Sequence, residues 1–262
     1  MSEHQGRVIV ITGGETGIGR AAVLRLAAEG AIMVIGGILE EEGAATVKAV
    51  RDAGGRAEFH RTDVRKTEDV DALVDGAVRD HGRIDGLICS AAVFDGFASG
   101  IDTTDALWDH IMDVNTRGTF LACRAALRHM VPAGRGRIVN VASIGGLVGM
   151  ADGASYTASK HAVVGLTKHL GCYYAKEGVT VNAICPGAIE TNVRANSQRL
   201  LGADAPPMAG VGADPDWVKR AVPMQRKGQP DEMTGIISFL LGDGASYVTG
   251  QCFTADGGWT AK

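Results

Sequence analysis

The sequence has little of what marks a nucleic-acid-binding, metal-binding or disulfide-stabilised protein. Its 262 residues hold 26 Lys and Arg against 30 Asp and Glu, so the net charge is −4 and no basic excess would attract a phosphate backbone. The five cysteines are scattered without a Cys-x-x-Cys pair, and the seven histidines include no pair at metal-binding spacing. We therefore expect no nucleic-acid partner, no metal site and no disulfide framework.

Long apolar segments are also missing. The longest stretch without a charged residue, 138–151, contains Asn140, Ser143 and three glycines, and it is too short and too polar to span a bilayer. The first residues include Glu3 and lack a basic segment followed by an apolar run, so they do not resemble a secretory signal peptide. These absences predict a cytoplasmic protein without a membrane partner.

What is present is an ordinary globular composition in which two patterns alternate. Hydrophobic residues make up 45% of the chain and charged residues 21%, which excludes disorder for most of it. Short β-branched runs alternate with longer segments whose apolar residues recur three and four positions apart. Because the runs have no polar face, they are typical of parallel strands covered by helices on both sides. The pattern predicts one doubly wound α/β domain over residues 1–262.

The expected strands lie near residues 7–12, 31–36, 57–60, 86–90, 137–141, 179–184 and 248–254, and the expected helices over 17–29, 40–53, 67–81, 105–130 (as two stretches), 156–176 and 231–240. The segment 188–222 has no clear pattern apart from a short possible helix at 216–220. It follows a strand whose carboxyl end faces the ligand crevice of such a sheet, and long loops in compact domains are usually functional. We expect 188–222 to be a substrate lid, with a plain surface insertion as the alternative.

A glycine-rich turn joins the first expected strand to the first helix, reading Thr-Gly-Gly-Glu-Thr-Gly-Ile-Gly over 12–19. Gly13, Gly17 and Gly19 allow a sharp turn, close approach to a pyrophosphate and tight helix–strand packing, while the helix N-terminus supplies N–H donors. We interpret the turn as a dinucleotide-phosphate cradle, although ordinary turns share this composition. Asp63-Val64 after the third strand could reach an adenine amino group, and a helix or turn cap is the alternative reading.

A second group of residues predicts acid/base chemistry. Tyr156 and Lys160 are four apart at the start of a helix, so both lie on one face, where the ammonium would favour the phenolate and lower the pKa of the phenol. Ser143, thirteen residues upstream at the end of a strand, could hold a substrate oxygen beside the phenol. The pair alone would be typical of a solvated helix face.

Together these features resemble the short-chain dehydrogenase/reductase family, and the resemblance covers essentially the whole chain. The matching residues are Thr12-x3-Gly17-Ile18-Gly19, Asp63-Val64, Asn115, Ser143, Tyr156-x3-Lys160, Pro186-Gly187 with Thr191, and Asp256-Gly257-Gly258. The resemblance implies a Rossmann-type, seven-stranded sheet and a homotetramer.

The resemblance also implies roles for individual residues. Tyr156 would be the catalytic acid/base, Ser143 would orient the substrate oxygen, and Lys160 would bind the nicotinamide ribose and depress the pKa of Tyr156. Asn115 would hold a water that links Lys160 to solvent. The residues expected around the cofactor are Gly13, Glu15, Gly17, Ile18, Gly19, Gly37, Asp63, Val64, Ser90, Ala91, Tyr156, Lys160, Pro186, Gly187, Ile189 and Thr191.

Two positions depart from the family pattern. Cys89-Ser90-Ala91-Ala92 stands where the family usually has Asn-Asn-Ala-Gly, and we expect Cys89 to be a small buried residue instead of a reactive thiol. The second expected strand ends at Gly36-Gly37 with neither the acid typical of NAD enzymes nor the base typical of NADP enzymes. Because Glu15 would repel a 2′-phosphate, we expect NAD in preference to NADP.

The sequence therefore predicts an NAD(P)-dependent oxidoreductase that moves a hydride between the nicotinamide and a small-molecule secondary alcohol or ketone. Apolar residues of the lid, Met208, Val211, Trp217, Val218, Val222 and Met224, suggest a fairly apolar and cyclic substrate, although lid packing alone would explain them. The alternatives are an NADP-dependent ketoreductase of acyl thioesters and a nucleotide-sensing protein that has kept the fold without the chemistry.

Overall fold

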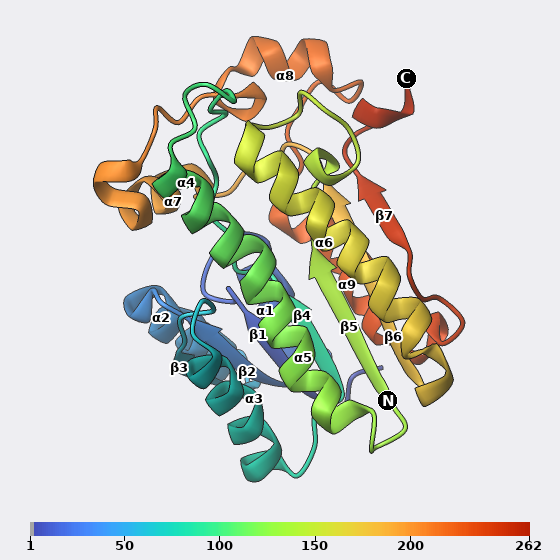
Figure 1. Cartoon of the computed structure of the whole chain (residues 1–262). Helices are drawn as coiled ribbons and strands as arrows, with labels where there is room; N and C mark the ends of the chain where they lie inside the picture. Colours follow the sequence, from blue (N-terminus) through green and yellow to red (C-terminus); the bar gives the residue numbers. More distant parts are fainter. Residues whose placement is uncertain (1–2) are drawn as a thin grey trace.

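A parallel sheet of seven strands in the order β3-β2-β1-β4-β5-β6-β7 forms the centre of the computed structural model, which describes residues 3–262 (Figure 1). The strands are β1 (Val8–Thr12), β2 (Ile32–Gly37), β3 (Arg56–Arg61), β4 (Gly86–Cys89), β5 (Gly136–Val141), β6 (Val179–Pro186) and β7 (Cys252–Ala255). The chain runs outward from β1 to β3 and then returns to β4 on the other side of β1. Such a reversal opens a ligand crevice at the carboxyl ends of the strands.

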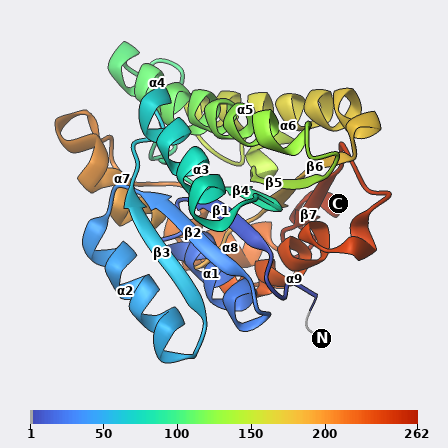
Figure 2. The same cartoon turned by 90° about the horizontal axis from the view of Figure 1, so that it is seen from below.

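Helices cover both faces of the sheet, as Figure 2 shows, with α3, α5 and α6 on one face and α1, α2 and α9 on the other. The helices are α1 (Gly17–Ala28), α2 (Glu40–Asp52), α3 (Thr67–His81), α4 (Asp105–Ile111), α5 (Gly118–Met130), α6 (Ala154–Tyr173), α7 (Val193–Leu201), α8 (Pro215–Ala221) and α9 (Pro230–Leu241). The predicted doubly wound α/β fold is confirmed.

Successive residues of each strand serve the two layers in turn. Val8 and Val10 of β1 pack into the core beneath α3 and α5, whereas Ile9 and Ile11 pack beneath α1 and α9. Because both faces are buried, the strands read as continuous apolar runs, which is the pattern that identified them. The largest boundary error is at β7, which begins at Cys252 instead of near residue 248.

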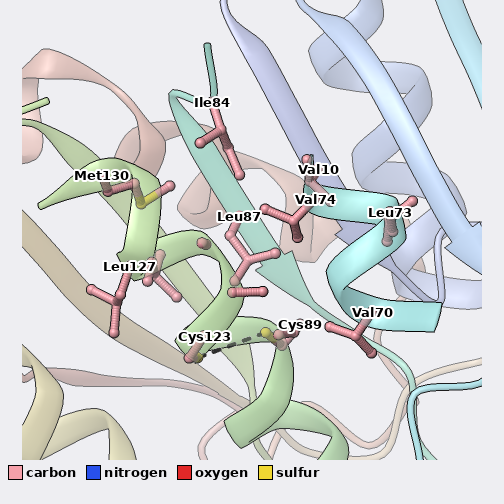
Figure 3. Close-up of a cluster of buried hydrophobic side chains, with 14 of the residues drawn as sticks. Val10, Val70, Leu73, Val74, Ile84, Leu87, Cys89, Cys123, Leu127 and Met130 are labelled. Atoms are coloured by element: carbon pink, nitrogen blue, oxygen red, sulfur yellow. Dashed lines mark hydrogen bonds between the residues drawn. The ribbon is translucent and has the colours of Figure 1, made fainter. Parts of the chain in front are cut away.

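The thiol of Cys89 belongs to this core, as expected. Figure 3 shows it beside Leu87 and Val70, with its sulfur 3.9 Å from that of Cys123. Hydrogen bonding to Cys123 and burial raise its pKa well above the usual range, so the thiol form is strongly favoured. Cys89 is a packing residue at the end of β4.

The segment 188–222 has more regular structure than the sequence indicated. It contains α7 as well as α8, which begins with Pro215 and is capped by the Asp214 side chain. The sequence signal for α7 is weak because the helix has only nine residues and no acid in its first turn, although Asn192 at its start is a residue type that favours a helix N-terminus. In Figure 1 both helices lie towards the end of the molecule to which the strand arrows point.

Among residues 3–262, no helix is long and apolar enough to cross a membrane.

Candidate active site

A cavity of about 370 Å³ lies at the carboxyl ends of the strands. Its walls combine the turn after β1, the end of β2, the segment 90–94 after β4, the residues after β5 and β6, and part of α7. These segments are far apart in the sequence, and the crossover at β1 and β4 brings them together.

The cavity wall contains almost every residue expected near the cofactor. These are Gly13, Glu15, Gly17, Ile18, Gly37, Asp63, Val64, Ser90, Ala91, Tyr156, Lys160, Pro186, Gly187, Ile189 and Thr191. Gly19 is not part of the wall, because it packs against the carbonyl of Gly13, where a side chain would collide. Gly13 has a φ of 72° and approaches the backbone of Ala91, so a side chain there would be strained and crowded.

A buried carboxylate positions Tyr156 at the start of α6. The Oδ2 atom of Asp95 accepts hydrogen bonds from the backbone N–H of Tyr156 at 2.8 Å and from the Ser155 hydroxyl at 3.0 Å. The first amides of a helix have no partner within it, and a negative charge there is stabilised by the helix dipole. Phe94 packs edge-on against the Tyr156 ring, with the centroids 5.3 Å apart. Sequence analysis missed Asp95, because it lies in a loop 61 residues before Tyr156.

Ser143, which follows β5, faces a second carboxylate that sequence analysis also missed. Its hydroxyl donates to Asp152 Oδ2 at 3.2 Å and accepts from the backbone N–H of Gly145 at 3.0 Å. Burial raises the pKa of Asp152 to about 6, against the opposing hydrogen bond from Ser143. The carboxylate is therefore poised to change charge just below neutral pH, beside the proposed substrate oxygen.

Lys160 is almost fully buried one helical turn after Tyr156. Its ammonium donates to the carbonyl of Val141 at 2.9 Å and lies 5.3 Å from the centre of the Tyr156 ring. Burial lowers its pKa to about 8, while the charge of Asp152 acts in the other direction. The two side chains share a helix face, as their spacing predicts.

The pKa of Tyr156 corrects an expectation from the sequence. It is raised in this structure, chiefly because burial disfavours the phenolate and because the charges of Asp152 and Asp95 add to that effect. Hydrogen bonding from Ser143 and the charge of Arg194 act in the opposite direction. The lowering expected from Lys160 is not found in this structure, where burial and two carboxylates that the sequence did not place near the phenol raise the pKa.

Asn115 lies in a π-helical turn, Met112–Arg117, between α4 and α5. Its side-chain oxygen accepts from the backbone N–H of Val93, and its amide donates to the carbonyl of Val93 and to the Ser159 hydroxyl, at 2.9–3.1 Å. The side chain therefore ties the loop after β4 to α6, while its backbone carbonyl accepts from Thr119 at 2.8 Å. Such turns are frequent at functional sites.

Glu15 covers the end of β2. Its carboxylate lies so close to Gly37 that any side chain at residue 37 would collide with it. Burial raises its pKa, against hydrogen bonding from the backbone, including that of Ile38 and Leu39. Its Oε2 atom is buried and has no hydrogen-bond partner among the described residues. The glycine-rich turn thus supplies an acid, Glu15, at the end of β2, where the strand itself has none. Its Oε2 atom can accept a hydrogen bond from a hydroxyl group.

Asp63 is held by its neighbour at the same end of the cavity. Arg65 donates to both carboxylate oxygens of Asp63, at 2.9 Å and 2.7 Å, and this interaction lowers the pKa of the acid. Arg65 also lines the cavity, and its charge there is matched by Asp63.

Most apolar side chains of 188–222 pack on one another instead of facing the cavity. Val218 and Val222 form a cluster with Val211, Trp217 and Trp259, while Met224 is exposed. Of the six residues taken as a substrate signal, only Val211 lines the cavity. Packing in that cluster accounts for Trp217, Val218 and Val222, and Met208 packs against a second cluster that includes Val93 and Leu107.

Comparison with known proteins agrees with this geometry. Residues 13–260 match the family model described as enoyl-(acyl carrier protein) reductase. A cis-4-hydroxycyclohexanecarboxylate dehydrogenase of Sinomonas cyclohexanicum is 40% identical over 97% of each chain, and a putative ketoacyl reductase of the monensin polyketide synthase of Streptomyces virginiae is 40% identical over 98% of each. The crystal structure of a levodione reductase superposes with a TM-score of 0.89 at 34% identity, covering 98% of this chain and 99% of the other.

Proposed function

Because the chain belongs to the short-chain dehydrogenase/reductase family and is an oxidoreductase acting on CH–OH groups, we propose that it oxidises a ring-borne secondary alcohol with NAD, using Tyr156 as the general base. One observation carries the proposal: Tyr156, Ser143 and Lys160 meet on one wall of a cavity whose other end holds the unpaired acceptor of Glu15. The ring is supported by the relative from Sinomonas, which is named for a hydroxycyclohexane substrate.

The side chains divide the proton chemistry among them. Ser143 donates a hydrogen bond to the substrate oxygen, in place of its bond to Asp152, and Tyr156 accepts the hydroxyl proton. Lys160 holds positive charge beside the phenol ring and would bind the ribose hydroxyls of the cofactor. A bound oxidised nicotinamide would accept the hydride and add the positive charge that the phenolate needs here. Asn115 holds α6 through its hydrogen bond to Ser159, and its backbone carbonyl, which already accepts from Thr119, would also accept from a water that relays the proton.

The cofactor preference for NAD rests on Glu15 and Gly37. A ribose 2′-hydroxyl would donate to the unpaired Oε2 atom of Glu15, whereas a 2′-phosphate would meet a buried carboxylate of the same charge. Asp63 already pairs with Arg65, a basic residue of the cavity wall. Titration with NADH and NADPH, read as energy transfer from protein fluorescence to the nicotinamide, should show tighter binding of NADH. Tighter binding of NADPH would contradict the assignment.

The segment 188–222 acts in this proposal as a substrate lid. Its helix α7 brings Val193, Arg194 and Leu200 to the cavity and is joined to the glycine-rich turn by a hydrogen bond from Asn196 to Thr16 at 3.3 Å. A disulfide engineered between α7 and that turn should slow turnover and leave the fold intact, as circular dichroism would show. Unchanged turnover and substrate choice in the cross-linked protein would refute the lid.

Assembly as a homotetramer in the reduced cytoplasm completes the proposal. Trp108, Phe120 and Tyr173 expose large apolar rings along α4, α5 and α6, and such rings favour burial against another copy. The five cysteines are all free, which suits a reducing compartment. Light scattering coupled to size exclusion should give four times the monomer mass of 27.2 kDa.

An NADP-dependent reductase of acyl thioesters is the competing function, favoured by the relative from Streptomyces. One assay separates the two: purified protein with NAD⁺ and cyclohexanols, against the same protein with NADPH and a β-ketoacyl thioester. We expect turnover in the first mixture only. Turnover confined to the second would replace the proposal.

A further inference from the structure

Arg194 extends from α7 into the reaction end of the cavity. Its guanidinium carbon lies 5.1 Å from the centre of the Phe94 ring, and the same ring packs edge-on against Tyr156. One aromatic ring therefore separates a cation from the proposed general base. The position of α7 relative to Phe94 is fixed by a hydrogen bond, because the buried hydroxyl of Ser197 on α7 accepts from the backbone N–H of Phe94 at 2.8 Å.

The charge of Arg194 is not matched by an ion pair. Within residues 3–262 no carboxylate lies within 4.0 Å of it, and its one hydrogen bond runs from Nε to the carbonyl of Ala209 at 3.4 Å. The two acids whose charges act on it have other partners: Asp152 accepts from Ser143, and Glu190 pairs with Lys227 at 3.0 Å. Both Nη groups thus remain available in a half-buried position, where an unpaired charge is costly.

The backbone leaves room for this guanidinium. A Cβ atom on Gly212 would stand only 3.0 Å from both Nη1 and Nη2 of Arg194, so the absence of a side chain at 212 keeps this space open. A planar guanidinium with two free Nη groups suits a carboxylate, which it binds through two parallel hydrogen bonds. The chemistry thus favours a planar anion in the cavity.

That anion belongs to the substrate side and not to the cofactor phosphates. Successive helical residues are turned by about 100°, so Asn196 points roughly opposite to Arg194 on α7. Asn196 donates to Thr16 in the phosphate cradle, whereas Arg194 contacts Phe94 beside Tyr156. The helix therefore presents one side chain to each end of the cavity.

We propose that Arg194 is a specificity-determining residue that binds a carboxylate group of the substrate, about one ring width from the hydroxyl group that is oxidised. The substrate class is then a cyclic hydroxycarboxylic acid. The reaction in this statement rests on the proposed function, while the anion site stands on the position of Arg194 alone.

The first test compares a charged substrate with a neutral isostere. We would measure kcat/KM with NAD⁺ for 3- and 4-hydroxycyclohexanecarboxylate and for the two matching carboxamides, using wild type, Arg194→Met, Arg194→Lys and Arg199→Met. Loss of a charged hydrogen bond should lower kcat/KM for a carboxylate by about 10–100-fold in Arg194→Met, with little change for the carboxamides. Arg194→Lys should recover part of the loss. Arg199, an exposed residue of the same helix paired with Glu42, provides the matched control and should change nothing.

The second test does not need turnover. Cyclohexanecarboxylate has no hydroxyl group to oxidise, so calorimetric titration into the NADH-loaded enzyme reports the anion site alone. We expect binding that weakens about 10-fold or more in Arg194→Met. Equal rates for carboxylates and carboxamides in the wild type, or binding unaffected by Arg194→Met, would overturn the inference. Failure to oxidise any alcohol, with carboxylate binding intact, would instead overturn the proposed function and leave the anion site standing.

Discussion

The two ends of the cavity are built in different ways. The cofactor end consists largely of backbone and glycine, with Glu15 lying over Gly37 and Asp63 paired with Arg65. The reaction end consists of charged and polar side chains, among them Asp95, Asp152 and Arg194, that arrive from four separate segments around Tyr156. In the proposed function, the first end would bind the cofactor mainly through main-chain groups, whereas the second would control charge where a proton moves. The comparison teaches that binding can be encoded locally, while acid/base control needs distant residues.

Removing the phenol hydroxyl of Tyr156 should have the largest effect, and it should be confined to the reaction end of the cavity. Tyr156→Phe should lower kcat about 10²–10⁴-fold, because it removes the group that exchanges the proton, and NADH binding should be kept. Stopped-flow turnover and fluorescence titration measure the two effects, with Tyr247→Phe, a fully exposed tyrosine, as the control. Near-normal turnover of Tyr156→Phe would mean that another residue is the base.

Removing the buried cap tests whether the reaction end depends on a distant carboxylate. Asp95→Ala leaves the backbone N–H of Tyr156 and the Ser155 hydroxyl without their acceptor, which should cost about 2–4 kcal/mol of unfolding free energy. Urea unfolding followed by circular dichroism measures the loss, against Asp109→Asn at an exposed site. A change under about 0.5 kcal/mol would show that α6 does not need the cap.

Neutralising Glu15 tests the cofactor end of the cavity separately from the reaction end. Glu15→Gln keeps the shape of the side chain and removes its charge, so the preference for NADH over NADPH should fall about 10-fold while kcat with NADH changes little. The ratio of the two dissociation constants gives the result. Glu41→Gln, an exposed acid on α2, removes the same charge outside the cavity and should leave the ratio unchanged.

The smallest expected effect concerns the pH dependence set by Asp152. Its charge raises the pKa of Tyr156, so Asp152→Asn should lower that pKa and move the rising limb of kcat/KM for alcohol oxidation to lower pH, by about one unit or less. Asp105→Asn, on the exposed start of α4, is the control. A limb that moves to higher pH would show that Asp152 does not act through its charge.

The same carboxyl group has a predictable effect on stability. Its pKa is raised from its ordinary value of 3.8 to about 6 by folding, so between these values the native state binds more protons than the unfolded state. Stability should therefore fall as the pH rises from about 4 to 6, and this part of the fall should be absent in Asp152→Asn. Thermal unfolding across this range checks the sign.

Much of the fold could be predicted because its signals are local. Strands such as Val8–Thr12 carry apolar residues toward both faces of the sheet, and this pattern can be recognised from the sequence alone. The helix α7 was missed because it is short and has no acid in its first turn, and its position depends on contacts such as that of Ser197 with Phe94. Boundaries shifted most at β7, where Val248 and Thr249 before the strand are β-branched like strand residues.

The candidate site divides in the same way. The glycine-rich turn, Ser143, Tyr156 and Lys160 were identified from short motifs, and the structure places all of them at one cavity. Asp95, Asp152 and Arg194 carry no such motif, since a single acid or arginine in a loop is usually solvated. The direction of the Tyr156 pKa shift differs from the expectation chiefly because the burial of the phenol could not be judged from the sequence, and secondly because Asp152 and Asp95 were not recognised as its neighbours.

The sequence by itself determined the strands and most of the helices, the glycine-rich turn proposed to hold a dinucleotide, and the pair of Tyr156 and Lys160 on one helix face. Periodic burial, the freedom of glycine at positive φ and helical spacing act over a few residues, so they can be read along the chain. Only the tertiary structure decided which charges surround the phenol, which acid covers Gly37 and which cation is left unpaired. Those features depend on desolvation and on distances between residues far apart in the chain, and both quantities exist only once the segments have packed.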